Sequence, residues 1–276
     1  YMREMIDFDN PSSFPKELQM WDARFEDYIR NRISLEGVTE WWQIEHQLQD
    51  LCLKESNSVV DFLNNNLETE VAVWHCTRVL NEEDFWRNGI IVSGGRGCLG
   101  EKRIRLLLSQ IGVAQDMIEK IFKHIYVYWD RNIESRTESV HFQGDKKTIY
   151  NDVNASIFAT NLGGEIVRWS IENIDKNLHK KEPYKRLWIL GKPCIIKFKC
   201  KLSQMRERSR TDVIVEILKY FIVTKMYKYP YEFDFTGMTI GSVPSENILS
   251  IEEIENFIEI HEKYEVGFYD ELKNNK

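Results

Sequence analysis

Beyond residue 70, short strand-like runs alternate with helical patterns at irregular spacing, and no other feature constrains the fold as strongly. Each run is apolar and rich in β-branched or aromatic residues, or alternates apolar with polar residues, as strands do. The runs are VAVWH (71–75), SVHF (139–142), SIFAT (156–160), PCIIKFKCKL (193–202), YEFDFTG (231–237) and the end of SVPSENILSI (242–251). Because regular βαβ spacing is missing, the pattern predicts an α+β fold with a split sheet.

Helical periodicity defines most of the remaining chain. In the first segment, apolar residues from Phe14 to Ile29 recur with a period close to 3.6, and Gly37 is a typical stop. Helices are predicted at 14–36, 40–68, 80–89, 101–129, 163–178 and 212–227, and in the tail from residue 251. The first two helices predict an acidic helical module that spans residues 1–70.

Cysteine usage and hydropathy indicate the compartment. The five cysteines are scattered and form no CxxC pair, which favours free thiols in a reducing environment over disulfides or a zinc site. No apolar stretch approaches the roughly 20 residues of a membrane span, and the acidic, polar first residues are unlike a signal peptide. We therefore expect a cytoplasmic protein that does not enter a membrane.

Charge is distributed unevenly along the chain. Residues 176–228 contain fifteen Lys or Arg against four Asp or Glu, whereas residues 1–70 contain six against fifteen. Clustered cations beside Tyr184 and Trp188 suit a polyanion, so we predict a nucleic-acid partner for the 176–228 segment. The alternative, that these cations balance acidic neighbours on a solvated face, is equally compatible with the sequence.

Several common site motifs are missing. The glycine-rich GGRGCLGEKR (94–103) resembles a phosphate-binding loop, but Glu101 separates Gly100 from Lys102, whereas a Walker motif needs Gly-Lys-Ser/Thr. The histidines lack metal-ligand spacing, and no GxSxG nucleophile elbow is present. The sequence therefore does not indicate a nucleotide-triphosphate loop, a metal site or a serine hydrolase.

Three other motifs carry a family resemblance. VWHCTR (73–78) is followed by Asn81 and NGI (88–90), then by SIFATNLGGEIVRW (156–169), and last by YEFDFTGMTIGSVPSENILSI (231–251). Their order resembles the ADP-ribosyltransferase superfamily, in its poly-ADP-ribose polymerase branch and among bacterial toxins that modify DNA bases. The resemblance implies a split antiparallel ADP-ribosyltransferase-like core in residues 71–276, with a helical insertion at about 101–139.

The resemblance also implies an NAD site around the first motif. NAD cleavage passes through a cation-like transition state, so the enzyme must orient the ribose and stabilise positive charge. His75, at the expected end of a strand, would bond a ribose hydroxyl beside Thr77. The backbone at Cys76 would hold the nicotinamide amide, although the family has Gly there. Arg78 and Arg96 would neutralise the pyrophosphate.

Aromatic residues are expected to stack on the nicotinamide ring. Trp169 stands where the family helix carries Tyr, and Phe158 lies in the preceding strand. A Trp in place of Tyr keeps the π-face and loses the hydroxyl. Tyr150 and Tyr126 are alternatives for this ring.

A glutamate in the third motif is the expected catalytic carboxylate. We predict Glu232, because an alternating strand would place it on one face with Asp234 and Thr236. There it would orient the ribose and act as general base for the incoming nucleophile. Asp234 and Glu246 are the competing candidates.

Together the motifs predict an NAD-dependent ADP-ribosyltransferase with His75 and Glu232 as catalytic residues and NAD as co-substrate. The resemblance to toxins suggests a bacterial toxin or defence effector that modifies nucleic acid or protein, regulated by an antitoxin-like partner. Related alternatives are an NAD glycohydrolase and an RNA 2′-phosphotransferase. A different class is a non-catalytic module that binds nucleic acid or protein on a degenerate transferase fold.

Overall fold

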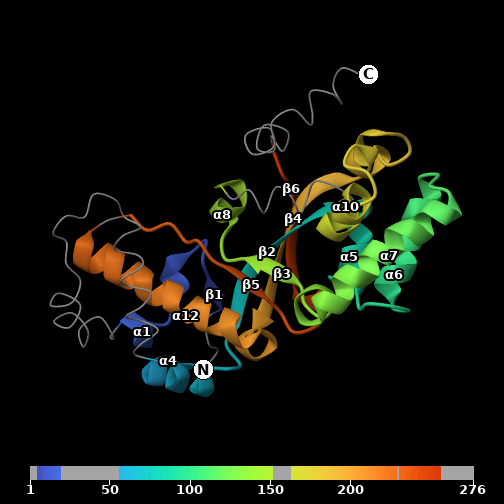
Figure 1. The fold of residues 1–276 in the computed structure, drawn as a ribbon. Coiled ribbons are helices and arrows are strands. Elements are labelled where there is room, and N and C mark those ends of the chain that lie inside the picture. Colours follow the sequence, from blue (N-terminus) through green and yellow to red (C-terminus); the bar gives the residue numbers. More distant parts are fainter. Residues whose placement is uncertain (1–4, 20–55, 152–162, 229, 256–276) are drawn as a thin grey trace, which may run out of the picture.

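The computed structural model describes residues 5–19, 56–151, 163–228 and 230–255, whose strands form one mixed sheet (Figure 1). The strands follow the order β5-β3-β2-β4-β6, and β1 pairs beside β2. All neighbours are antiparallel except β1 and β2. The predicted α+β class is confirmed, whereas the predicted division of the sheet into two is not found among the described strands.

The elements have the following bounds. The strands are β1 (Ile6–Asp7), β2 (Glu70–Val79), β3 (His141–Gln143), β4 (Lys192–Lys201), β5 (Thr236–Met238) and β6 (Ile248–Glu253). The α-helices are α1 (Lys16–Gln19), α4 (Ser56–Asn65), α5 (Glu82–Asn88), α6 (Leu99–Gln110), α7 (Gln115–Arg131), α8 (Lys146–Asn151), α10 (Gly164–Glu172), α11 (Arg186–Ile189) and α12 (Glu207–Phe221). Short 3-10 turns cover Pro11–Ser13, Leu178–Lys180, Leu202–Gln204 and Ser245–Asn247, and π-helical turns cover Ile133–Thr137 and Ile222–Tyr227.

Strands β2 and β4 are the longest in the sheet and pair over their whole length. Their register runs from Glu70 opposite Lys201 to Val79 opposite Lys192. Because β4 offers ten residues of partner backbone, β2 continues four residues past the predicted end at His75. The expectation that His75 ends a strand is therefore wrong, since it lies inside β2.

Where β3 pairs with β5, phenylalanine rings pack directly against glycine residues. Phe142 lies opposite Gly237, and the side of Gly144 is occupied by the ring of Phe235. β5 begins only at Thr236, so the predicted strand at 231–237 is wrong for residues 231–235. The predicted alternation of burial still holds there, because Phe233 and Phe235 are buried and pack against Phe8.

One hydrophobic cluster joins the sheet to α12. It contains Val71 and Val73 of β2, Ile196 and Phe198 of β4, and Val213 of α12. Residues from the first part of the chain complete this cluster: Ile6, Phe8, Phe14, Leu18 and Leu63. Most of the predicted helices 14–36 and 40–68 lies outside the described residues, so the separate 1–70 module stays a prediction.

A second hydrophobic cluster joins α6, α7, α10 and α11, at the end of the sheet opposite to α12 in this view (Figure 1). A single helix at 101–129 was predicted, but the chain turns at Gly112, whose φ of 93° is in the left-handed region that favours glycine. The turn lets α6 and α7 pack on each other, and Ile121 and Trp129 of α7 are buried. Val167 and Ile171 of α10 complete the contact.

The predicted helices at 80–89, 163–178 and 212–227 are present but differ in length. Helix α5 begins where expected, with the Asn81 side chain accepting a hydrogen bond from the Glu83 amide, and it ends at Gly89. Helix α10 stops at Glu172, six residues before the predicted end, and α12 starts five residues earlier than predicted. Residues 251–253 belong to β6 instead of a helical tail, and the predicted strand 156–160 lies outside the described residues.

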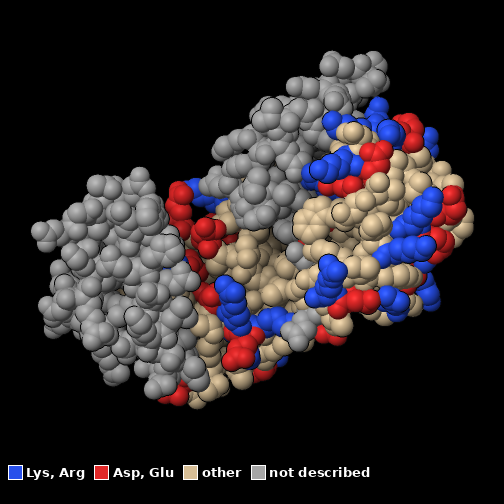
Figure 2. Space-filling view, viewed as in Figure 1, with Lys and Arg blue, Asp and Glu red and all other residues tan. Residues whose placement is uncertain are grey.

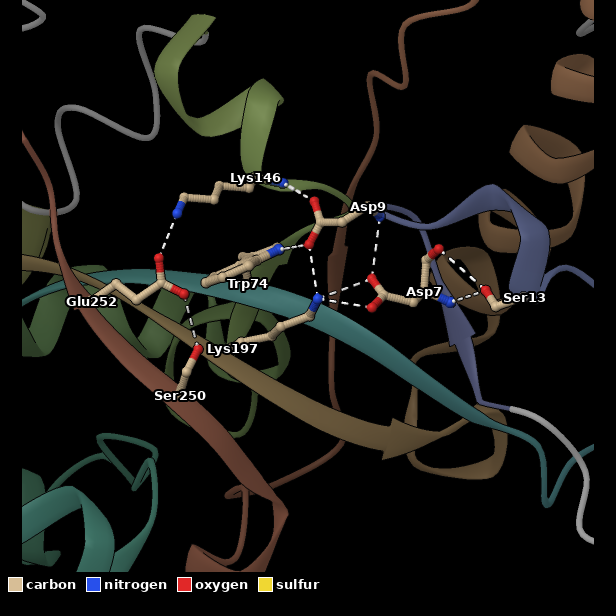
Figure 3. A network of polar contacts seen from close by, with 8 residues as sticks. All are labelled: Asp7, Asp9, Ser13, Trp74, Lys146, Lys197, Ser250 and Glu252. Atoms are coloured by element: carbon tan, nitrogen blue, oxygen red, sulfur yellow. Dashed lines mark hydrogen bonds and ion pairs between the residues drawn. The ribbon is translucent and has the colours of Figure 1, made fainter.

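A polar network fixes the N-terminal segment to the sheet face that carries Trp74 (Figure 3). Lys197 Nζ lies 2.8 Å from carboxylate oxygens of both Asp7 and Asp9. The Trp74 indole N–H donates to Asp9, also at 2.8 Å, and Lys146 forms an ion pair with Glu252. Burial alone would lower the pKa of Lys197. The bonds to Asp7 and Asp9 outweigh that effect, so the pKa is raised.

Candidate functional site

A cavity of about 520 Å³ lies where the sheet meets α10. Its volume is in the range of pockets that hold small molecules. Residues from four segments line it: Trp74–Thr77 of β2, Ile90–Ser93 after α5, Ser139–Gln143 around β3, and Gly163–Ile166 with Trp169 at α10; Thr236 of β5 adds one more contact. The cavity thus brings together His75, Cys76, Thr77 and Trp169, four of the residues that the sequence predicted for one site.

His75 is held as a neutral imidazole. Its Nδ1 lies 2.9 Å from the His141 carbonyl oxygen, and since a carbonyl only accepts, Nδ1 carries the proton. Burial lowers the pKa of His75, and the bond to His141 opposes this only in part. The other nitrogen, Nε2, is then a hydrogen-bond acceptor suited to a hydroxyl of a ligand.

Trp169 supplies an aromatic surface in the cavity. It is 38% exposed, like Trp86 on α5 at 46%, whereas Trp74, Trp129 and Trp188 are buried. The ring of Tyr128 from α7 packs edge-on against it, with centroids 5.5 Å apart and planes at 68°. Helix α7 therefore supports the cavity from outside. Phe158, the other predicted ring, lies outside the described residues.

Glu165 and Gln143 are among the polar residues of the cavity that were not predicted. Glu165 is 7% exposed in the first turn of α10, where a helix favours a negative charge, and the Tyr128 hydroxyl lies 3.4 Å from its Oε1. Gln143 is 4% exposed at the end of β3. An acidic residue after the Gly163-Gly164 pair is a readable signal for Glu165, whereas nothing in the sequence around Gln143 distinguishes it.

Glu232, the predicted catalytic residue, lies in a different place. It lines a second cavity of about 540 Å³ together with Asp145, Lys147 and Tyr150, and it forms an ion pair with Lys147. Its side chain is 66% exposed. The structure does not bring Glu232 to His75, because residues 231–235 do not join the sheet beside β3. The competing candidates Asp234 and Glu246 do not line the His75 cavity either.

The two predicted pyrophosphate ligands also lie outside the His75 cavity. Arg78 occupies the face of β2 opposite to His75 and Thr77, and its Nε donates to the Leu190 carbonyl at 2.7 Å. Arg96 forms an exposed ion pair of 2.6 Å with Asp130 and lies over the ring of Tyr126.

The glycine-rich loop is closed by a carboxylate of the chain itself. The Gly97 amide donates to Glu101 Oε2 at 2.7 Å, and Tyr126 donates to Glu101 Oε1 at 2.6 Å. Burial raises the pKa of Glu101, but the bonds from Tyr126, Gly97 and Arg105 outweigh it, so the pKa is lowered and the group stays ionised. A phosphate at this amide would meet that negative charge.

The basic segment 176–228 is extensively paired with acidic groups. Its ion pairs are Lys181–Asp175, Arg186–Glu182, Lys192–Glu253, Lys197–Asp7, Lys197–Asp9, Lys199–Glu70, Lys201–Glu68, Arg206–Glu138, Arg208–Asp212 and Lys219–Glu216. On the face drawn in Figure 2, basic and acidic groups are interspersed instead of separated by sign. Neutralisation by neighbouring acids therefore accounts for much of the charge that suggested a polyanion partner.

Comparisons with known proteins identify no relative. A scan against protein-family models finds no match, and searches of curated proteins and of solved structures find none either. Within the described ranges, no group of three or more His, Cys, Asp or Glu side chains is arranged to hold a metal ion, and no helix has the length and apolar character of a membrane span. Function must therefore be inferred from the chemistry of the cavities themselves.

Proposed function

We propose that the His75 cavity binds NAD and that the protein is an ADP-ribosyltransferase. The observation that supports this most is the convergence of a neutral histidine, a partly exposed tryptophan and a buried carboxylate on one cavity. These are the groups that cleavage of the nicotinamide–ribose bond requires: one to orient the ribose, one to stack on the base, and one to stabilise positive charge.

Each residue has a specific role in this proposal. His75 Nε2 accepts a hydrogen bond from a ribose hydroxyl, and Trp169 stacks on the nicotinamide ring. Glu165 takes the role first predicted for Glu232: its carboxylate stabilises the cation-like transition state and receives the proton of the acceptor. In this reaction the bond between nicotinamide and ribose breaks, and nicotinamide leaves with the electron pair of that bond. The acceptor forms the new bond to the ribose carbon and loses its proton to Glu165.

Nucleic acid is the acceptor class that we test first, with protein and water as the alternatives. The cations of residues 176–228 gave this prediction, and their ion pairs leave fewer of them available to phosphates. Release of ADP-ribose to water would identify a glycohydrolase. The toxin-like role and the antitoxin-like partner stay predictions from the family resemblance.

The experiment is NAD turnover with NAD labelled in the adenylate half, in the presence of DNA, RNA and a protein mixture. His75→Ala and Glu165→Gln are compared with wild type and with Glu83→Gln, an exposed control on α5. We expect label on one acceptor class, turnover lowered at least a hundredfold in His75→Ala and Glu165→Gln, and no change in Glu83→Gln.

Glu232→Gln is measured in the same assay, because it separates the two candidate carboxylates. Loss of turnover in Glu232→Gln with full activity in Glu165→Gln would transfer the carboxylate role to Glu232. A folded wild-type protein that neither binds nor consumes NAD would overturn the transferase proposal, and salt-dependent binding to nucleic acid would then favour the non-catalytic module.

A further inference from the structure

Gln143 is a buried residue whose side-chain oxygen has no partner. The residue is 4% exposed, and no hydrogen bond to its Oε1 is found among the described residues. It lies at the end of β3, opposite Trp74 of β2 on one side and Thr236 of β5 on the other. Buried side-chain oxygens are hydrogen-bonded in most proteins, because leaving one unbonded costs free energy.

Neighbouring polar groups in the sheet region are satisfied. The Thr148 hydroxyl bonds to Asp145 and to the Phe233 carbonyl, and the Thr239 hydroxyl accepts from the Val140 amide and donates to the Gly241 carbonyl. The unbonded oxygen of Gln143 is therefore not typical of this part of the molecule. Unlike Trp129, whose unbonded indole N–H is packed in the helical cluster, Gln143 lines the His75 cavity.

The chemistry of a primary amide defines what would satisfy it. Gln143 offers an acceptor oxygen beside a donor nitrogen, so its best complement is a group with a donor beside an acceptor. A carboxylate has no donor and would repel the Gln143 oxygen, and a hydroxyl would satisfy one atom of the pair. The residues that line the described part of the cavity include no Lys or Arg, so nothing there favours an anion.

The rest of the cavity favours a flat ligand. Trp169 presents a ring that Tyr128 holds in place, and His75 is neutral. A planar aromatic or heteroaromatic ring would stack on Trp169 while its polar edge reaches other residues of the wall.

We propose that Gln143 is a specificity-determining residue that selects planar ligands with an amide edge, meaning an N–H donor beside a C=O acceptor. Two sources present this edge, a ring carboxamide such as that of nicotinamide and the lactam edge of a nucleobase such as uracil. The choice of nicotinamide as the first probe rests on the proposed NAD site, whereas the amide-edge selectivity rests on the cavity alone.

Binding is tested by ligand-observed NMR titration of the full chain with nicotinamide, nicotinate and uracil. Nicotinate replaces the amide by a carboxylate. Because the Glu165 carboxylate of the same cavity also disfavours nicotinate in both proteins, the contact with Gln143 is measured by the change in preference between wild type and Gln143→Leu. Wild type is compared with Gln143→Leu, which replaces the amide by a smaller apolar side chain, and with Gln115→Leu, an exposed glutamine on α7 as the matched control. We expect nicotinamide to bind at least tenfold more tightly than nicotinate, and Gln143→Leu to reduce this preference while Gln115→Leu keeps it.

Thermal unfolding without ligand distinguishes a binding role from a structural one. If the Gln143 oxygen is hydrogen-bonded only when a ligand is present, Gln143→Leu removes an unsatisfied oxygen from the free protein. The melting temperature then stays unchanged or rises. A melting temperature several degrees lower, affinities for nicotinamide and for uracil that are both equal in wild type and Gln143→Leu, or no binding of any probe by the folded wild type would each overturn the proposal.

The outcomes also separate this inference from the proposed function. Binding of uracil that depends on Gln143, with no effect on nicotinamide, would identify a nucleobase as the source of the amide edge. Amide binding that depends on Gln143 in a protein that does not consume NAD would leave the inference standing and overturn the transferase. NAD turnover, nicotinamide binding and uracil binding that are all unaffected by Gln143→Leu would overturn the inference alone.

Discussion

The protonation state of His75 gives a prediction about pH. Because burial lowers the pKa of His75 below its ordinary value of 6.5, the imidazole stays neutral at pH values where an exposed histidine is already half protonated. We expect the acidic limb of ligand binding that depends on His75 to lie below pH 6.5. An NMR titration of the histidine ring signals, assigned with His75→Gln, measures this directly.

The free energy of unfolding should also depend on the protonation of His75, and the pKa shift defines the direction of this dependence. Below pH 6.5 the unfolded chain binds a proton at His75 before the folded protein does, so the free energy of unfolding falls as the pH drops and is fully restored above 6.5. Denaturant unfolding of wild type and His75→Gln at several pH values isolates this contribution. A ring that titrates above 6.5, or equal pH dependence of stability in both proteins, would contradict a partly buried, neutral His75.

Residues of the cavity were predicted best where they are neighbours in the sequence, and worst where distant segments meet in the fold. His75 and Thr77 fall in one cavity because they alternate along one strand, which can be read from the sequence. Glu165 and Gln143 enter the same cavity through tertiary packing, and of the two only Glu165 has a local signal, the preceding Gly163-Gly164 pair. Glu232 was expected there because an alternating segment resembles a strand, yet alternating burial also arises in irregular backbone over a core.

At the level of elements, the pairing of β3 with β5 depends on Gly237. A methyl group at Gly237 would meet the ring of Phe142, the registered partner residue, and that ring is buried. We expect Gly237→Ala to lower the free energy of unfolding by about 1–3 kcal/mol, as overpacking does. Denaturant unfolding followed by circular dichroism measures the change.

The cause is tested by making room for the added methyl group. Phe142→Leu shrinks the opposing side chain, so the loss caused by Gly237→Ala should be smaller in the Phe142→Leu background than in wild type. If the two losses simply add, the ring over Gly237 is not the reason for the glycine, and the pairing of β3 with β5 must be explained differently.

Helices with clear end signals were predicted closely, and those set by packing were not. Helix α5 has an Asn at its start and a Gly at its end, and both lie where expected. The apolar periodicity of 101–129 continues through Gly112, because α6 and α7 both bury their apolar faces in one cluster. The turn between them arises from this contact, and the sequence shows it only as a single glycine inside a long periodic segment.

For the whole molecule, the main question is whether the first 70 residues are separable. The described parts supply Ile6, Phe8, Phe14 and Leu18 to the cluster beneath α12, and the ion pairs of Lys197 hold the same segment against the sheet. A regulatory module that can be removed would leave the core intact. Because these contacts bury apolar side chains in the core, we expect that deleting residues 1–68 yields a chain that does not fold cooperatively.

The contribution of the N-terminal segment to the free energy of unfolding can be measured at Phe14. Its ring is 2% exposed and packs against Phe8, Phe221 and Phe233, with centroids 5.3, 6.0 and 5.8 Å away. Removing a buried ring leaves a cavity, so we expect Phe14→Ala to lower the free energy of unfolding by about 3–5 kcal/mol. Trp86→Ala is the control, because Trp86 is 46% exposed on α5 and its loss should change that free energy by under about 0.5 kcal/mol. Equal stability of Phe14→Ala and wild type, together with a soluble, cooperatively folded 69–276 fragment, would show that the N-terminal segment is a separable module after all.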